Sequence, residues 1–405
     1  MNILFLTDNF PPETNAPASR TYEHAKEWVK SGAHVTVITT APNFPNGKVH
    51  DGYKNDLYKI ETMDGIKVIR VWTFITANQG FMLRTLDFIS FMFSAIIASI
   101  SQKKIDIIIG TSPQFFTALA ACIISKLKRK PWIFEVRDLW PDSIVGLKYL
   151  KKGFLFKCLK KIEYFLYKDA KKIIVVTKSF KKILVENGID KEKIKCITNG
   201  VDCNKFHPNK NSEELKNSLE ISNNIVFGYI GTHGEAHGLE TLLECAKKIQ
   251  DNNAKVKFLF IGQGSKKKSL MLHAEANKLK NVIFLDSVSR DEIVNYWSVI
   301  DYSIIHLKKL EIFKTVIPSK IFESIAMQKP ILIGVDGEAK EIIENNNLGL
   351  FFSPENVDEL ISKINFVLEN PEEVKKFKIN TEKIRFSYHR PNLAKKMLEI
   401  IERID

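Results

Sequence analysis

The residue pattern with the clearest chemical meaning is VIPSKIFESIAMQKPIL, from Val316 to Leu332. Pro318 suits the first turn of a helix, where a missing N–H costs nothing. Lys320 in that turn has the wrong sign for the helix dipole, but an anion bound at the helix start would make it favourable. Glu323, one turn further, suits the two hydroxyls of a ribose. The pattern therefore predicts a sugar-nucleotide site, and an ordinary Lys–Glu surface pair is an equally weighted alternative.

A glycine-rich loop, GYIGTHGEAHGLETL, lies between a predicted strand that ends at Ile230 and a predicted helix. Glycines let a backbone approach a phosphate closely, and His233 and His237 could donate hydrogen bonds to its oxygens. The following strand ends in a second loop, Gly262–Gln263–Gly264, and no acid follows that would bind an adenosine ribose. The spacing therefore does not match the dinucleotide fingerprint. For the glycines alone, a tight strand-to-helix turn explains the loop better.

Two loops in the first half of the chain gather polar residues after predicted strands. EVRDLWPDS places Arg137 and Asp138 directly after a strand, where the carboxyl end of a parallel sheet faces a cleft. DNFPPETNAPASR follows the first strand, with Asn15 and Arg20 near the start of the next helix. The first loop favours a function in the cleft over surface ion pairs. For the second loop, a structural turn and a substrate loop are equally consistent.

The segment LKYLKKGFLFKCLKKIEYFLYK combines lysines and aromatic residues around an apolar helical stripe. Lys157, Lys160 and Lys161 lie beside the stripe, and Phe154 and Phe156 lie at its margin. This pattern is typical of an interfacial helix on an anionic membrane, where each basic residue contributes about 1 kcal/mol. A core-packed helix with a solvated lysine face is the less favoured alternative. The predicted stripe consists of Leu155, Leu159, Ile162, Phe165 and Leu166.

Short β-branched runs alternate with helical patterns along the whole chain and must position these groups. Such alternation predicts an α/β fold with open parallel sheets. A loop rich in Asn, Pro and charge at residues 203–223 divides the strands into two series. We therefore expect two Rossmann-like domains that face a cleft: residues 1–203 with a returning helix at about 385–405, and residues 204–384. The predicted strands are Ile3–Thr7, His34–Thr39, Ile66–Val71, Ile105–Gly110, Trp132–Val136, Ile173–Thr177, Ile225–Ile230, Val256–Ile261, Val282–Leu285, Tyr302–His306 and Ile331–Gly334.

The chain of 405 residues carries 60 Lys and Arg against 47 Asp and Glu, a net charge of +13. Residues 148–182 hold 12 lysines and two acids, so most of the excess lies in one segment, which argues against a nucleic-acid-binding protein. Five scattered cysteines indicate a reducing cytosol and no structural zinc. The longest charge-free apolar stretch, Phe88 to Gln102, is shorter than the ~20 residues of a membrane span, so we expect no span.

In these motifs the chain resembles the retaining GT-B glycosyltransferases of family GT4. PSKIFESIAMQKP is the most specific shared motif, and NGVD at Asn199–Asp202 and EVRDLWP add to it. Within the family the chain looks closest to the N-acetylfucosamine transferases of O-antigen and capsule synthesis, the WbuB type. The resemblance implies a UDP-sugar donor, an undecaprenyl-diphosphate-linked acceptor and a cytoplasmic, peripheral location at the inner face of the cell membrane. It implies neither a metal nor a cofactor.

The resemblance also implies roles for residues of this chain. Lys320 and the backbone at Thr315–Val316 would meet the diphosphate, Glu323 the ribose, and Val288 and Arg290 the uracil. The donor set is Gly231, Thr232, His233, Gly234, His237, Gly262, Gly264, Val288, Arg290, Thr315, Val316, Pro318, Ser319, Lys320 and Glu323. The acceptor set is Asn15, Arg20 and Ser112, and the catalytic set is Lys320, Arg137, Asp138 and Glu311.

Three positions depart from the family pattern. Thr315 stands where the first Glu of the E-x7-E pattern belongs, and the nearest acid is Glu311. THGEAH replaces the Arg and Lys that many members carry after the glycine loop, and Thr111–Ser112–Pro113 replaces a common His. We expect a retaining transferase that acts as a monomer or weak dimer. The alternatives are a sugar-nucleotide 2-epimerase of the same architecture and a non-catalytic, membrane-docked partner of a polysaccharide assembly complex.

Overall fold

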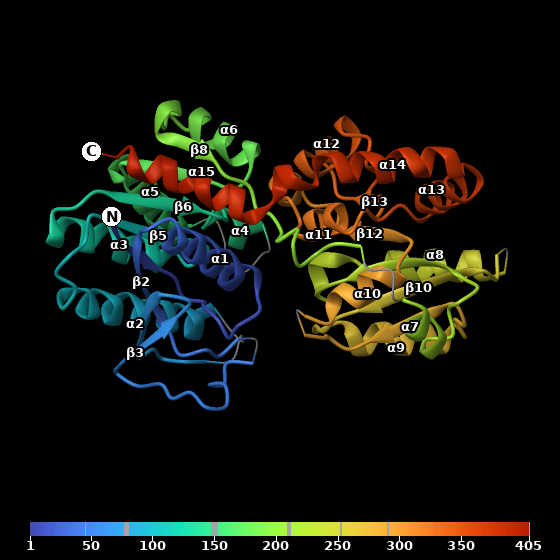
Figure 1. The fold of residues 1–405 in the computed structure, drawn as a ribbon, viewed down its shortest axis with the longest axis horizontal. Helices are drawn as coiled ribbons and strands as arrows, with labels where there is room; N and C mark the ends of the chain where they lie inside the picture. The colour runs from blue at the N-terminus through green and yellow to red at the C-terminus, as the bar shows by residue number, and fades with distance from the viewer. Residues whose placement is uncertain are drawn as a thin grey trace. The chain divides into compact units, whose positions relative to one another are not determined.

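The computed structural model describes residues 1–44, 46–76, 81–146, 153–208, 212–251, 253–289 and 291–404. The chain divides into two compact units (Figure 1). The N-terminal unit consists of Met1–Thr198 and Arg390–Asp405, and the C-terminal unit is Asn199–His389. Each unit is an α/β domain with its own sheet and its own apolar core.

The sheet of the N-terminal unit is mixed. Its strands are β1 (Asn2–Leu6), β2 (His34–Thr40), β3 (Tyr58–Met63), β4 (Ile66–Val71), β5 (Ile107–Thr111), β6 (Trp132–Val136), β7 (Lys172–Val175) and β8 (Ile194–Cys196). Their spatial order is β3-β4-β2-β1-β5-β6-β7-β8. All pairs are parallel except β3 with β4, which is antiparallel. The expected parallel arrangement holds for the other strands, and at this edge a half-exposed strand returns in an antiparallel hairpin.

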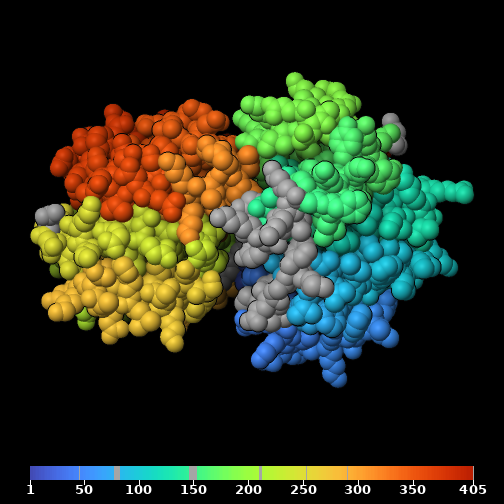
Figure 2. Space-filling model, turned by 180° about the vertical axis from the view of Figure 1, so that it is seen from behind, coloured from blue at the N-terminus to red at the C-terminus, as the bar shows by residue number. Residues whose placement is uncertain are grey.

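Helices cover both faces of this sheet. One face carries α1 (Ala16–Lys30) and α15 (Arg390–Glu402), and the indole N–H of Trp28 donates to the Ala394 carbonyl at 2.8 Å (Figure 1). The other face carries α2 (Phe81–Ile100), α3 (Phe115–Lys128), α5 (Phe154–Asp169) and α6 (Lys178–Glu186). Figure 2 shows the molecule from that second face. The short helix α4 (Asp142–Gly146) follows β6.

The sheet of the C-terminal unit is parallel throughout. Its strands are β9 (Ile225–Ile230), β10 (Val256–Ile261), β11 (Val282–Leu285), β12 (Tyr302–His306), β13 (Ile331–Gly334) and β14 (Gly349–Phe351), in the order β11-β10-β9-β12-β13-β14. One face packs against α8 (Glu240–Gln250), α9 (Lys267–Ala276) and α13 (Val357–Glu369). The other packs against α7 (Glu213–Ser218), α10 (Ile293–Val299), α11 (Lys320–Ala326) and α12 (Glu338–Asn345). Helix α14 (Pro371–Ile384) contacts both α11 and α13.

The two units divide a few residues from the predicted boundaries. We expected the first boundary after residue 203 and the second near residue 385, whereas the chain divides after Thr198 and after His389. The reason is a local pairing inside the C-terminal unit. Val201 forms a β-bridge with His389, and the Cys203 backbone N–H donates to Nδ1 of His389 at 3.1 Å.

Helix α2 bears on the expectation that the chain has no membrane span. Its residues Leu83–Ile100 pass for a span by length and composition alone, with a mean hydropathy of 1.6 and 28% of the window buried. The expectation counted only charge-free residues from Phe88 onward, whereas this window also includes Arg84 and Asp87. In the structure, α2 packs Phe91 and Ala95 into the core under the sheet. It therefore packs one side against the sheet and exposes apolar side chains such as Phe93 and Ile97 on the other.

Candidate sugar-nucleotide site

The candidate site lies where β9, β10 and β12 end in the C-terminal unit, at the carboxyl edge of a parallel sheet. Helix α11 begins at Lys320, and Ile321, Phe322 and Ile325 anchor it in the core. The loop after β9 contains a short 3-10 turn, Glu235–His237, before α8 begins. Ligands of open parallel sheets bind at this edge, so the fold brings the two strongest sequence motifs to a suitable place.

The side chain of Lys320 lies in a slot above Gly231. A Cβ on Gly231 would come within 2.1 Å of Cε and 2.4 Å of Nζ of Lys320, so only glycine leaves room for the lysine. The ammonium lies 5.1 Å from the centre of the Tyr229 ring. Within the described part of the chain, Nζ forms no hydrogen bond and no ion pair. Burial lowers the pKa of Lys320 to about 8, opposed by the nearby Glu323.

Two neutral histidines flank this lysine. His233 is fully buried, and neither ring nitrogen has a hydrogen-bond partner. Burial, reinforced by Lys267 and Lys320, lowers the pKa of His233 to about 4. Burial, and next to it the charge of Lys320, lowers the pKa of His237 to about 3. Both rings are therefore uncharged at neutral pH, so among the described residues neither histidine adds a positive charge beside Lys320.

Gly262 and Gly264 of the second loop allow it to pack closely against the first loop. A Cβ on Gly262 would lie 1.9 Å from the Gly231 carbonyl oxygen, and one on Gly264 would lie 2.3 Å from the His233 carbonyl oxygen. The His233 N–H donates to the Gln263 carbonyl at 2.9 Å. The loops therefore continue the β9–β10 pairing beyond the strands. This agrees with the tight-turn interpretation of the glycines and gives Gly231 alone a direct link to Lys320.

His306, at the end of β12, is a positioning residue that the sequence analysis did not select. Its Nδ1 lies 2.7 Å from the His237 carbonyl oxygen, and its Nε2 accepts the Glu355 backbone N–H at 3.0 Å. Its ring stacks on Phe352, and burial lowers its pKa. This arrangement requires a neutral ring protonated at Nδ1. His306 thus fixes the loop that carries His237.

Two lysines from other loops occupy the neighbourhood of Glu235. Glu235 pairs with Lys266 at 2.6 Å and with Lys308, and these hydrogen bonds lower its pKa to about 2. The backbone of Lys308 also donates to the Ala236 carbonyl. The fold therefore supplies cations near the glycine loop although the loop itself lacks the Arg and Lys of the family pattern. The sequence analysis did not select Lys266 and Lys308, because both are far from the glycine loop in the sequence.

Glu311 and Thr315, the two residues considered for the first position of the E-x7-E pattern, have partners of their own. Glu311 is 86% exposed and pairs with Lys314 at 2.7 Å, while the Thr315 hydroxyl donates to the Ile312 carbonyl. The contacts that these two side chains make, with Lys314 and with the Ile312 carbonyl, do not bring them to Lys320. The remaining donor residues lie in the loops after β9, β11 and β12, half-buried or exposed: Thr232, Gly234, Val288, Val316, Pro318 and Ser319. Arg290 lies outside the described residues.

In the N-terminal unit, Arg20 is an internal residue. It is 2% exposed and forms an ion pair with Glu135 at 2.9 Å. Its other nitrogens donate to the carbonyls of Ile197 and Thr198. The guanidinium therefore joins β6 to the end of the unit, and a role of Arg20 toward an acceptor stays a prediction.

Asn15 and Ser112 also have local partners. Asn15 caps α1, with Oδ1 accepting the Ala18 N–H at 2.9 Å. The Ser112 hydroxyl accepts the backbone N–H groups of Arg137 at 2.7 Å and Asp138 at 3.2 Å. Ser112 thus holds the loop after β6 in place. Their roles toward an acceptor stay predictions.

Arg137 and Asp138 lie together after β6, as predicted. Nε of Arg137 is buried without a hydrogen-bond partner, while its Nη1 lies 3.3 Å from the Pro17 carbonyl oxygen. Burial lowers the pKa of Arg137 to about 10 and raises that of Asp138. Among the described residues, no three His, Cys, Asp or Glu side chains gather as a metal site.

Comparison with known proteins extends this picture. The family described as Glycosyltransferase Family 4 matches residues 18–205, and the family described as Glycosyl transferases group 1 matches residues 211–384. The structure is similar to that of HepE from Anabaena in complex with UDP and glucose, with a TM-score of 0.73 over 99% of both chains at 18% identity. The chain is a GT-B glycosyltransferase.

Sequence relatives of this glycosyltransferase are bacterial. It is 25% identical to WcaI of Escherichia coli over 92% of its own length and 93% of that protein, whose name refers to colanic acid biosynthesis. It is 25% identical to WbjE of Pseudomonas aeruginosa over 65% of its own length and 66% of that protein. The two-domain fold predicted from the sequence is confirmed. The N-acetylfucosamine specificity stays a prediction.

Proposed function

We propose that the glycosyltransferase transfers a sugar from a UDP-sugar to a lipid-diphosphate-linked saccharide, with retention of the anomeric configuration. The observation that carries this proposal is the ammonium of Lys320 in its slot over Gly231, which has no hydrogen bond or ion pair with any residue that the structure describes. A half-buried cation without a hydrogen-bonded anion is unfavourable, and a bound anion would remove that cost. A diphosphate supplies that anion, and the UDP complexes of HepE support this choice by analogy.

The chemistry follows from where charge develops. The bond between the anomeric carbon and the diphosphate oxygen breaks, and the electron pair leaves with UDP. Lys320 would stabilise this growing negative charge in a preorganised position, which is usually the largest catalytic term. The acceptor hydroxyl attacks from the same face and gives its proton to the departing phosphate. No side chain is needed as a nucleophile, and we assign none.

A bacterial surface polysaccharide is the proposed context. The names of relatives refer to colanic acid, teichuronic acid and capsular polysaccharide synthesis. We propose an N-acetylated 6-deoxyhexosamine as the transferred sugar, on the resemblance of the sequence to the WbuB type. The roles of Arg137 and Asp138 in sugar recognition rest on the same resemblance.

Helix α5 supports contact with a membrane, although only part of the predicted stripe is exposed. The helix buries Leu159 and Leu166 but leaves Phe154 85% exposed, and Leu155 and Phe165 are exposed as well. Exposed apolar side chains next to Lys157 and Lys161 suit an anionic interface. Lys160 differs because it pairs with Asp142 and Glu163. Phe156 is half-buried.

A panel of nucleotides and nucleotide sugars tests the proposal by thermal shift. A ligand at 100 times its dissociation constant adds about 2.7 kcal/mol of stability. We expect UDP and one UDP-sugar to stabilise the protein and ADP and GDP not to. Conversion of the sugar without an acceptor would indicate the epimerase instead. Failure of every UDP compound, with membrane binding intact, would indicate the non-catalytic partner.

A further inference from the structure

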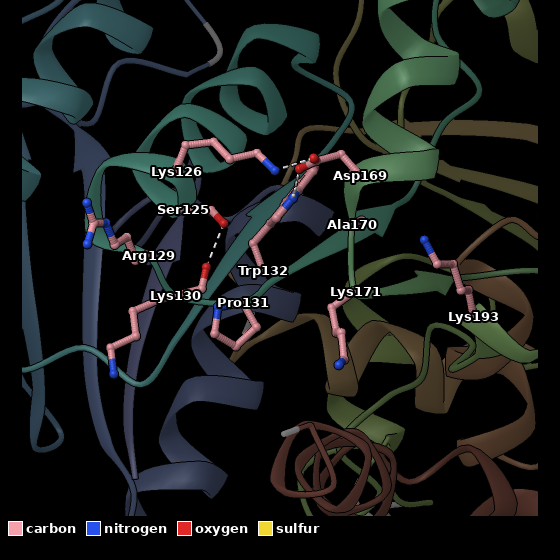
Figure 3. Close-up of a pocket in the computed structure, with 10 residues that line it drawn as sticks. All are labelled: Ser125, Lys126, Arg129, Lys130, Pro131, Trp132, Asp169, Ala170, Lys171 and Lys193. Carbon is pink, nitrogen blue, oxygen red and sulfur yellow. Dashed lines mark hydrogen bonds and ion pairs between the residues drawn. The ribbon is translucent and has the colours of Figure 1, made fainter.

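A basic pocket opens on the N-terminal unit at the amino ends of β6 and β7, the edge opposite to the carboxyl ends of these strands (Figure 3). Its volume is about 410 Å³. Its lining comes from the end of α3, the start of β6, the end of α5 and the segments beside β7 and β8. Five of the lining residues are cations and one is an acid: Lys126, Arg129, Lys130, Lys171, Lys193 and Asp169.

The single acid of this pocket is already engaged. Asp169 pairs with Lys126, and it accepts the indole N–H of Trp132 at 2.9 Å and the thiol of Cys122 at 3.3 Å. By contrast, the side chains of Arg129, Lys130 and Lys171 form no hydrogen bond or ion pair within the described part of the chain. The pocket is therefore a concave surface with excess positive charge, which attracts a phosphate group.

The local backbone presents these cations together. Helix α3 ends at Lys128, and Arg129 follows in the left-handed conformation with φ of 52°. The Ser125 hydroxyl donates to the Lys130 carbonyl at 2.6 Å, which holds the turn against the helix (Figure 3). On the far wall, Lys193 donates to the Lys168 carbonyl at 2.6 Å. The cations thus surround a formed depression.

An exposed apolar surface adjoins the pocket. Leu127, between two lysines, is 62% exposed, and Ile100 at the end of α2 is 65% exposed. Lys128 Nζ donates to the Ile100 carbonyl at 2.9 Å, so the ends of α2 and α3 lie together. From there the outer side of α2 continues with exposed Ile97 and Phe93. Figure 2 shows the face on which these helices lie.

Clustered cations beside exposed aliphatic side chains match the chemistry of an anionic phospholipid surface. Soluble proteins seldom expose such a contiguous apolar patch without an interaction partner. A free phosphate or nucleotide would use the cations alone and leave Leu127 and Ile100 in water. A phospholipid uses both, because its phosphate and its acyl chains lie side by side at the membrane interface.

We propose that this pocket binds the headgroup phosphate of an anionic phospholipid, with Leu127 and the outer side of α2 in the membrane interface. The inference rests on the proposed membrane association and adds a specific lipid site to it. It does not depend on which nucleotide sugar the C-terminal unit binds.

The test is co-sedimentation of the full chain with vesicles of phosphatidylcholine alone or with 30% phosphatidylglycerol. The variant Arg129→Asn/Lys130→Gln/Lys171→Gln removes three charges from the pocket, and asparagine tolerates the backbone of position 129. Its partition onto phosphatidylglycerol vesicles should fall by roughly 100-fold, since each basic residue near the surface accounts for about a fivefold change. The matched control removes three exposed lysines of the C-terminal unit: Lys247→Gln, Lys255→Gln and Lys280→Gln.

Equal losses in the two variants, or no loss in the pocket variant, would overturn the proposal. Leu127→Gln should weaken vesicle binding severalfold without changing calorimetric binding of inorganic phosphate. Tight binding of inorganic phosphate that vesicles do not improve would assign the pocket to a soluble anion. A dimer in sedimentation velocity that Leu127→Gln abolishes would assign the apolar surface to a second copy of the chain.

The UDP thermal shift separates this inference from the proposed function. UDP should stabilise the wild type and the pocket variant equally, which also shows that the variant is folded. If UDP fails on the wild type while vesicle binding follows the prediction, the proposed function falls and the lipid site stands. If UDP binds and vesicle binding ignores the pocket charges, the reverse holds.

Discussion

Replacing Lys320 with methionine should lower turnover and raise stability at the same time. Methionine keeps an unbranched stem in the slot over Gly231 and removes only the ammonium. A functional lysine that is desolvated and unpartnered in the free enzyme predicts both effects. An ordinary surface Lys–Glu pair predicts neither, because such pairs contribute less than about 1 kcal/mol.

The size of the stability change follows from the pKa of Lys320. Burial lowers this pKa from 10.5 to about 8, so the protonated side chain destabilises the folded state by about 3 kcal/mol at pH 7. Losing the contact of the ammonium with the Tyr229 ring offsets about 1 kcal/mol of the gain. The free energy of unfolding of Lys320→Met should therefore rise by about 2 kcal/mol at pH 7.

The pH dependence has a defined sign. The pKa of Lys320 is lower in the folded protein than in the unfolded chain, so between pH 8 and 10.5 the unfolded chain binds more protons. The lysine's contribution to stability therefore becomes more favourable as pH rises through this window. Lys320→Met should lack that contribution, and its advantage over the wild type should shrink between pH 7 and 9.5.

Urea unfolding at the two pH values measures stability, and steady-state kinetics with calorimetry of UDP measures function. The kcat of Lys320→Met should fall by about 10²- to 10³-fold, the usual loss for one preorganised stabiliser of developing charge. UDP affinity should fall much less. Unchanged turnover would refute the catalytic role, and equal losses in kcat and affinity would indicate uniform binding. A less stable variant would refute the desolvated state of Lys320.

Three further variants probe the supporting structure. Gly231→Ala should lower kcat by at least tenfold in the same assay, because its Cβ would displace Lys320. Activity equal to wild type would show that the position of Lys320 over Gly231 is not needed for catalysis. Arg20→Ala should lower the free energy of unfolding by about 3–5 kcal/mol in urea, because it leaves Glu135 buried and unpaired; a loss confined to acceptor KM would contradict this. His306→Leu should destabilise by about 2–4 kcal/mol, since two backbone groups lose their partner; intact stability would argue against its positioning role.

The sequence predicted the fold well because buried parallel strands leave a strong local signal. All eleven predicted strands are present, since runs such as Ile225–Ile230 and Val256–Ile261 are apolar on both faces. The strands that were missed lack this signal. β3 alternates between exposed and half-buried residues at a sheet edge, and β8 and β14 have three residues each.

The site was predictable where one segment carried the chemistry. Lys320 and the glycine loop stood out as motifs, and the fold places them in contact. His306 and Lys308 did not stand out, because their importance arises from partners about 70 residues away in the sequence, His237 and Glu235. Spacing along the chain carries no information about such pairs.

The difference between Lys320 and Arg20 shows what sequence reasoning lacks. Both are cations near the start of a helix that follows a parallel strand, and both resemble ligand-binding residues of the family. The fold satisfies Arg20 with a buried carboxylate and two carbonyls, so a ligand has little to add to it. It leaves Lys320 desolvated beside two neutral histidines, so an anion has much to add. The quantity that separates a binding residue from a structural one is the unmet demand for a partner, and only the three-dimensional structure reveals it.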